Sequence, residues 1–166
     1  MVIIKRIETK IIEKVLLNSC FGSNPKLATD YGTTEVTIDF LKTGRELVDF
    51  MSYNARKDVI KCYEIKVTME DFRSNAKKSW YGNYNYLVIS NDLYSKISLD
   101  DWKKEIPKGV GIIVVGIKSE SKEIVLRAAK KDISQETKDM LKNCLIRSMF
   151  YQNVKTDWEL RNFRLK

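Results

Sequence analysis

The run from Val110 to Gly116, VGIIVVG, carries no polar side chain and constrains the fold more than any other segment. A strand with an exposed face would place polar residues at alternate positions, so a fully apolar strand is typical of a sheet covered on both faces. The run from Tyr84 to Ser90 predicts a second short, buried strand. The chain therefore has to hold a sheet between two layers of other structure.

Three more strand-like runs lie earlier in the chain, rich in β-branched and aromatic residues. They cover residues 34–42, 45–53 and 59–68, and a loop is expected at 26–33. Because short turns join the three runs, we predict an antiparallel meander. Residues 123–129 indicate an edge strand.

Helical periodicity flanks these strands. Apolar residues at helical spacing predict an amphipathic helix over residues 5–20, and acidic residues followed by lysines favour another over 69–78. A helical turn is expected over 91–97, and a closing amphipathic helix over about 134–153. We predict a single α/β domain over residues 1–166, with a central mixed β-sheet flanked by helices.

Histidine is absent from the whole chain of 166 residues. Its absence excludes Ser-His-Asp and Cys-His nucleophilic schemes and histidine-rich metal sites. Cys20, Cys62 and Cys144 lack the paired spacing of a zinc site. Any chemistry must use carboxylates, lysines, hydroxyls or a metal held by oxygen ligands.

The formal net charge is +8, and the basic residues are spread along the chain. This balance favours a polyanionic partner, nucleic acid first, although the excess charge could equally serve solubility alone. No apolar run approaches the roughly 20 residues of a membrane span. The opening Met1–Ile4 is too short for a signal-peptide core. We therefore expect no membrane partner and a cytoplasmic location.

Charged side chains interrupt two of the predicted strands. Glu64 and Lys66 are two residues apart, so they share one face of their strand. Asp49 lies between Val48 and Phe50 in the preceding strand, and antiparallel pairing in the right register brings it near Glu64. Such alternation also occurs on solvated sheets, so this alternative stays open.

Two neighbouring carboxylates repel each other unless a divalent cation lies between them. Mg²⁺ binds through one or two carboxylates together with water and substrate phosphate. A lysine beside the carboxylates can hold or deprotonate the attacking water. The set therefore predicts metal-assisted phosphodiester hydrolysis, which needs no histidine.

Asp49 followed by Glu64-Ile65-Lys66 on the next strand, after an N-terminal helix, resembles the PD-(D/E)XK, restriction-endonuclease-like nuclease superfamily. The string 62–68, then Asp71-Phe72 and 82–86, is similar to small phage and bacterial members related to MmcB-type DNA-repair proteins. The resemblance covers about half of the chain, from Glu35 to Gly116. It implies a restriction-endonuclease-like core with the order αβββαβ.

The resemblance also implies that Asp49 and Glu64 ligate Mg²⁺ or Mn²⁺, that the Ile65 backbone carbonyl adds a ligand, and that Lys66 acts on the attacking water. One departure is that relatives often carry a histidine near the position of Asn83. Members of the superfamily often add a carboxylate from the first helix. Glu8 projects into the apolar stripe of that helix and is the candidate here, although a residue at a helix end can also reach water.

Basic, aromatic and amide side chains follow the Glu64-Ile65-Lys66 strand and predict a surface that contacts phosphates and stacks on exposed bases. The alternative is that the aromatic residues belong to the core. The predicted nucleic-acid-binding residues are Arg73, Lys77, Lys78, Tyr81, Asn83 and Asn85.

The leading hypothesis is therefore a Mg²⁺- or Mn²⁺-dependent nuclease, acting on DNA rather than RNA, in repair, recombination or phage biology. The alternative is a catalytically inactive nucleic-acid-binding or protein-interaction module on the same fold. Homodimerisation, which many members of the superfamily use to cut both strands, stays open.

Overall fold

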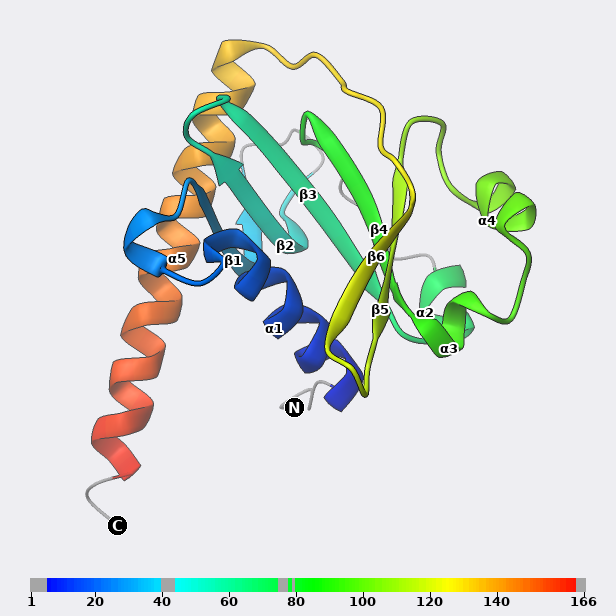
Figure 1. The fold of residues 1–166 in the computed structure, drawn as a ribbon. Helices are drawn as coiled ribbons and strands as arrows, with labels where there is room; N and C mark the ends of the chain where they lie inside the picture. Colours follow the sequence, from blue (N-terminus) through cyan, green and yellow to red (C-terminus); the bar gives the residue numbers. More distant parts are fainter. Residues whose placement is uncertain (1–5, 40–43, 75–77, 79, 164–166) are drawn as a thin grey trace.

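A computed structural model describes residues 6–39, 44–74, 78 and 80–163 of the chain (Figure 1). Its elements, in chain order, are α1 (Ile7–Phe21), the 3-10 helix η1 (Pro25–Leu27), β1 (Asp30–Ile38), β2 (Glu46–Asn54), β3 (Val59–Lys66), α2 (Met69–Arg73), β4 (Tyr84–Ser90), α3 (Asn91–Tyr94), α4 (Leu99–Glu105), β5 (Gly111–Gly116), β6 (Ser121–Leu126) and α5 (Gln135–Phe163).

The described strands form one six-stranded sheet in the order β1-β2-β3-β4-β5-β6. β1, β2 and β3 are antiparallel neighbours, which confirms the predicted meander. β4 then runs parallel to β3, β5 runs parallel to β4, and β6 returns antiparallel to β5. The α/β class with a mixed sheet flanked by helices is thereby confirmed.

Helices cover both faces of the sheet because successive residues of each buried strand point in opposite directions. In β3, Tyr63 and Ile65 pack against α1, whereas Ile60 and Cys62 pack against α5. The β4–β5 half of the second face is covered by α2, α3 and α4, whose contacts centre on Trp102. The apolar β5 strand lies between these layers, as its sequence predicts.

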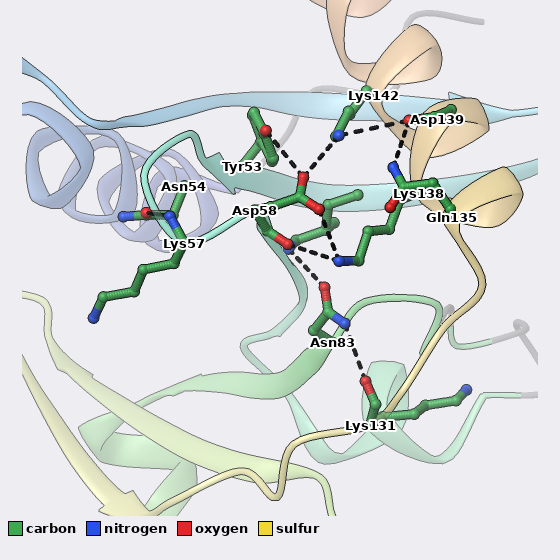
Figure 2. Close-up of polar contacts among 11 residues, drawn as sticks. Tyr53, Asn54, Lys57, Asp58, Asn83, Lys131, Gln135, Lys138, Asp139 and Lys142 are labelled. Carbon is green, nitrogen blue, oxygen red and sulfur yellow. Dashed lines mark hydrogen bonds and ion pairs between the residues drawn. The ribbon is translucent and has the colours of Figure 1, made fainter.

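The N-terminal part of α5 is fastened to the β2–β3 turn by one carboxylate (Figure 2). Asp58 accepts hydrogen bonds from Lys138 Nζ at 2.9 Å and from Tyr53 Oη at 3.1 Å, and Lys142 Nζ lies 2.7 Å away. Lys142, Lys138 and Tyr53 together hold the pKa of Asp58 well below its ordinary value. This cluster therefore ties the first turns of α5 to the β2–β3 turn.

The main differences from the sequence prediction are three boundaries and one helix. The loop expected at 26–33 is wrong in its last part, since β1 begins at Asp30. α2 ends at Arg73 rather than at Lys78. α4 was not predicted at all, and α5 continues to Phe163, ten residues past its expected end.

The C-terminal part of α5 extends away from the sheet (Figure 1), and its large apolar side chains are exposed. The exposed large apolar side chains of α5 as a whole are Ile146, Met149, Phe150, Tyr151, Val154, Trp158 and Leu160. None of the helices in the described part of the chain is both long enough and apolar enough to cross a membrane.

Candidate functional site

The β2–β3 hairpin determines where the predicted Asp49, Glu64 and Lys66 lie. Its paired register runs from Asn54↔Val59 at the turn to Phe50↔Tyr63. Asp49 directly precedes Phe50 in the chain. The predicted site therefore lies at the end of the paired ladder that is remote from the turn.

At that end, the carboxylate of Asp49 accepts a hydrogen bond from the backbone N–H of Ile65, with Oδ2 and N 2.7 Å apart. The side chain thus takes the position that a backbone carbonyl would occupy in a continued ladder. The N–H and C=O of one residue in an extended strand point toward the same neighbouring strand. The Ile65 carbonyl is therefore directed to the same side as the Asp49 carboxylate.

The backbone of β2 is irregular where it presents Asp49. Val48 and Met51 pack in the same cluster against α5, although residues three apart in a regular strand face opposite sides. In β1, Glu35 has a φ of 54°, a left-handed conformation that non-glycine residues rarely adopt. The β1–β2 register passes from Thr34↔Phe50 to Val36↔Val48, on either side of this point. Both strands are thus distorted beside Asp49.

Glu64 and Lys66 share one face of β3, as strand periodicity predicts. Their partners in β4 are Leu87 and Ile89, which pack in the layer formed by α2, α3 and α4. Glu64 is only 3% exposed and Lys66 only 8%. Burying charged groups is costly without partners of opposite charge or hydrogen bonds, so this pair marks an unusual position within the core.

Lys66 has a partner on α2 to which the sequence analysis gave no role. The Lys66 ammonium lies 3.5 Å from Oδ1 of Asp71, whose side chain is 48% exposed. Asp71 is held at the start of α2, where its backbone N–H donates to the side chain of Thr68. The signal was present in the sequence, because an acidic residue in the first turn of a helix directly after β3 lies close to that strand's last side chains.

Glu8 lies away from this group. It is exposed in the first turn of α1, and α1 packs through Ile12, Val15 and Leu16 on the face of the sheet opposite to Glu64 and Lys66. The structure does not bring Glu8 together with the other candidates.

The predicted nucleic-acid-binding residues on and after α2 are partly engaged elsewhere. Arg73 is exposed, and its guanidinium lies 3.8 Å from a carboxylate oxygen of Glu105. Lys78 Nζ lies 4.8 Å from the centre of the Phe72 ring. Lys77 lies outside the described residues.

The other predicted nucleic-acid-binding residues make internal hydrogen bonds. Tyr81 Oη donates to Glu46 at 2.9 Å, and burial, followed by this contact, raises the pKa of Tyr81 to about 12. Asn83 accepts from the N–H of Ile60 at 3.0 Å and donates to the carbonyl of Lys131 at 3.1 Å (Figure 2).

Asn85 closes the chain segment before β4. Its side-chain amide accepts from the N–H of Gly82 at 2.9 Å and donates to the Gly82 carbonyl at 3.0 Å. A Cβ at Gly82 would lie 2.9 Å from the Ile60 carbonyl oxygen, so the backbone here is tightly packed. Asn83 and Asn85 are therefore buried residues that hold this loop in place.

The oxygen donors at the end of the hairpin are of the kind that hard cations prefer. They are the carboxylates of Asp49 and Glu64 and the carbonyl of Ile65. Within the described ranges, no group of three or more histidine, cysteine, aspartate and glutamate side chains is arranged to hold a metal ion. Two carboxylates with one carbonyl still suit Mg²⁺, which usually retains several of its waters.

Comparisons with protein-family models and with curated proteins give no match. Among solved structures, the chain is similar to SPO1766, a protein of unknown function from Silicibacter pomeroyi. The TM-score is 0.57 at 15% sequence identity, and the match covers 82% of this chain and 85% of that one. At this level of identity the likeness shows a shared fold alone, so the function has to be argued from the site.

Proposed function

We propose that the protein is a Mg²⁺- or Mn²⁺-dependent nuclease that hydrolyses phosphodiester bonds in DNA. The observation that carries the proposal is the hydrogen bond from the Ile65 N–H to Asp49. It joins the β2 carboxylate to the backbone N–H of the residue that lies between Glu64 and Lys66.

A restriction-endonuclease-like core is part of the same proposal. Its support is the element order α1, β1, β2, β3, α2, β4, with β1 to β3 antiparallel and β4 parallel to β3. The PD-(D/E)XK resemblance rests on Asp49, Glu64 and Lys66, which lie at the end of two central strands of this arrangement.

In this proposal the carboxylates of Asp49 and Glu64 and the Ile65 carbonyl hold the cation. A bound divalent cation would polarise the phosphate and supply a water of lowered pKa. Lys66 orients the attacking water through its ammonium group and offsets the negative charge that develops on the phosphate. Asp71 holds that ammonium from the side of α2.

The net charge of +8 supports a polyanionic substrate. Cleavage assays with end-labelled single-stranded, duplex and branched DNA, in Mn²⁺, Mg²⁺ or EDTA, test the activity. We expect cleavage with either metal and none in EDTA. RNA of the same sequence distinguishes the two nucleic acids.

Variants of the site, each with a matched control, decide which residues cut. Glu64→Gln and Lys66→Met preserve the side-chain size and should abolish cleavage. Glu136→Gln and Lys96→Met make the same changes at exposed positions and should leave cleavage intact. The proposal fails if no substrate is cut, or if the site variants cut as well as their controls.

The alternative function is a nucleic-acid-binding module without catalysis. One observation is compatible with it: the net charge of +8 favours binding to nucleic acid whether or not the strand is cut. Thermal unfolding with and without Mn²⁺ separates the two functions. A rise in Tm with Mn²⁺ that Asp49→Asn removes would count against the inactive module.

A further inference from the structure

A pocket of about 240 Å³ lies at the turn end of the β2–β3 hairpin, remote from Asp49. On this face of the sheet, α1 packs on Tyr63 and Ile65 of β3. The pocket lies nearer the turn, at Val59 and Lys61 of the same strand. Its lining consists of Asn54, Lys57, Val59, Lys61, Tyr84 and Tyr86. Aromatic rings and lysine ammonium groups thus meet in one depression.

The ring of Tyr86 is held in a fixed orientation. It stacks on Tyr63, with ring centres 5.8 Å apart and planes 18° apart, and Tyr63 meets Phe50 edge-on at 5.5 Å. On β5, a Cβ at Gly111 would lie 2.6 Å from an edge carbon of the Tyr86 ring, so only glycine lets the ring lie against that strand. A ring positioned in this way loses little entropy when a ligand stacks on it.

Tyr84 and Lys61 extend this surface toward the turn. Tyr84 precedes Tyr86 by two residues on β4, so both rings lie on one face. Lys61 is the register partner of Tyr84 on β3. The two rings on β4 thus have one lysine beside them on β3.

The pocket carries a net positive charge. Lys61 Nζ lies 3.7 Å from Oδ1 of Asp30, and Asp30 also accepts a hydrogen bond of 2.7 Å from Asn54 Nδ2. Lys57 is exposed, and among the described residues its ammonium has no ion-pair partner.

We propose that this pocket binds one nucleotide of a single-stranded nucleic acid, with the base against Tyr84 and Tyr86 and the phosphates against Lys57 and Lys61. Every base has a face that can stack on an aromatic ring, and lysines follow the backbone. The volume lies below the roughly 300–1,000 Å³ of drug-sized ligand sites, which suits a single base. A duplex keeps its base faces stacked, so it cannot use the rings.

The choice of nucleic acid over another anionic ligand rests on the proposed nuclease function. The pocket lies on the opposite face of the sheet from the side chains of Glu64 and Lys66, and at the other end of β3. A nucleotide bound there is not the one that is cut. Loss of the pocket should therefore raise KM rather than lower kcat.

The test is fluorescence anisotropy of a labelled oligothymidylate in EDTA, where no cleavage occurs. Tyr84→Ala should weaken binding by about ten-fold, because one base–aromatic stack is lost. Tyr84→Phe should bind as the wild type does. Tyr151→Ala is the matched control on exposed α5 and should have no effect.

Lys57→Ala tests the phosphate contact independently of folding, since Lys57 is exposed. The slope of log affinity against log salt concentration should become smaller in magnitude by about one, because one phosphate contact is lost. Lys96→Ala should leave this slope unchanged. Binding to a duplex of equal length should not change measurably in Tyr84→Ala. The proposal is overturned if Tyr84→Ala and Lys57→Ala bind the oligothymidylate like their controls, or if duplex binding falls equally.

These results separate the pocket from the proposed nuclease. Variant-sensitive binding without any cleavage of DNA would support the pocket and reject the nuclease. Cleavage that requires Glu64, together with oligothymidylate binding that ignores Tyr84 and Lys57, would do the reverse.

Discussion

The carboxylate of Asp49 and the backbone N–H of Ile65 are joined by a 2.7 Å hydrogen bond at the end of the β2–β3 ladder. This bond gives Asp49 a structural role in addition to the proposed metal-binding one. It holds the last part of β3 against a strand whose backbone is already irregular. Loss of the carboxylate should therefore lower the stability of the fold and remove the proposed metal binding, and these two effects can be measured separately.

Asp49→Asn and Asp49→Ala should separate them. Asparagine retains an oxygen acceptor for Ile65, so unfolding free energy should fall by less than about 1 kcal/mol, whereas alanine leaves the N–H without its acceptor and should cost about 1–3 kcal/mol. Urea unfolding measures both values. Neither variant should gain stability from Mn²⁺, in contrast to the wild type. Equal losses for asparagine and alanine would show that the hydrogen bond is not what Asp49 contributes.

Asp71 should matter for cleavage more than for stability. It holds the Lys66 ammonium at 3.5 Å, but as a half-exposed partner it contributes less than about 1 kcal/mol to folding. In the proposed nuclease, Asp71→Asn should lower kcat about three- to ten-fold through misplacement of Lys66. Glu70→Gln changes the neighbouring exposed carboxylate and is the control. An unchanged kcat in Asp71→Asn would show that Lys66 does not depend on this contact.

The contact between Asp58 and α5 predicts a loss of stability in acid. In the folded protein, Lys142 and Lys138 hold the pKa of Asp58 below its ordinary value of about 3.9. The ionised carboxylate therefore favours folding above about pH 4, and this contribution is lost as the pH falls below that value toward the folded-state pKa. The difference in urea midpoint between wild type and Asp58→Asn should shrink between about pH 7 and about pH 3. Asp132→Asn, at an exposed site before α5, should show no such change.

Sequence periodicity predicted the bounds of strands with two buried faces more accurately than the bounds of partly exposed strands. β4 spans Tyr84–Ser90 as predicted, because its apolar run is bounded by polar residues. β1 begins at Asp30, before its expected start, since its first residues are polar, half-exposed and at the edge of the sheet. α4 escaped prediction because Trp102 is the residue it buries, and one buried position gives no period. Its Ser98 cap, which accepts from the N–H of Asp101, was a readable signal.

In the candidate site, too, some features follow from strand periodicity and others do not. The shared face of Glu64 and Lys66 follows from a period of two and agrees with their pairing to β4. The position of Asp49 does not follow from this period, because it depends on a side-chain hydrogen bond to Ile65 beyond the last pair of the β2–β3 ladder. Contacts of Lys66 with α2 likewise come from the packing of separate elements, which a strand pattern does not contain.

The expected end of α5 was wrong because its C-terminal part is helical without packing on the sheet. Two tryptophans, one buried in the core and one exposed on this part of α5, allow the contribution of packing to be tested. Trp102 is fully buried, packs edge-on against Phe72 at 5.2 Å and donates to the carbonyl of Tyr94 at 3.1 Å. Trp158 is 66% exposed on the projecting part of α5. Trp102→Ala should lower the free energy of unfolding by about 3–5 kcal/mol.

Trp158→Ala should change the free energy of unfolding by no more than about 0.5 kcal/mol, because little of its surface is removed from water in the isolated chain. Urea unfolding followed by far-ultraviolet circular dichroism measures both variants on the same scale. A loss above about 1 kcal/mol in Trp158→Ala would contradict this expectation. If that loss depended on protein concentration, Trp158 would be buried between associated copies, and sedimentation equilibrium would show the oligomer in the wild type and less of it in the variant.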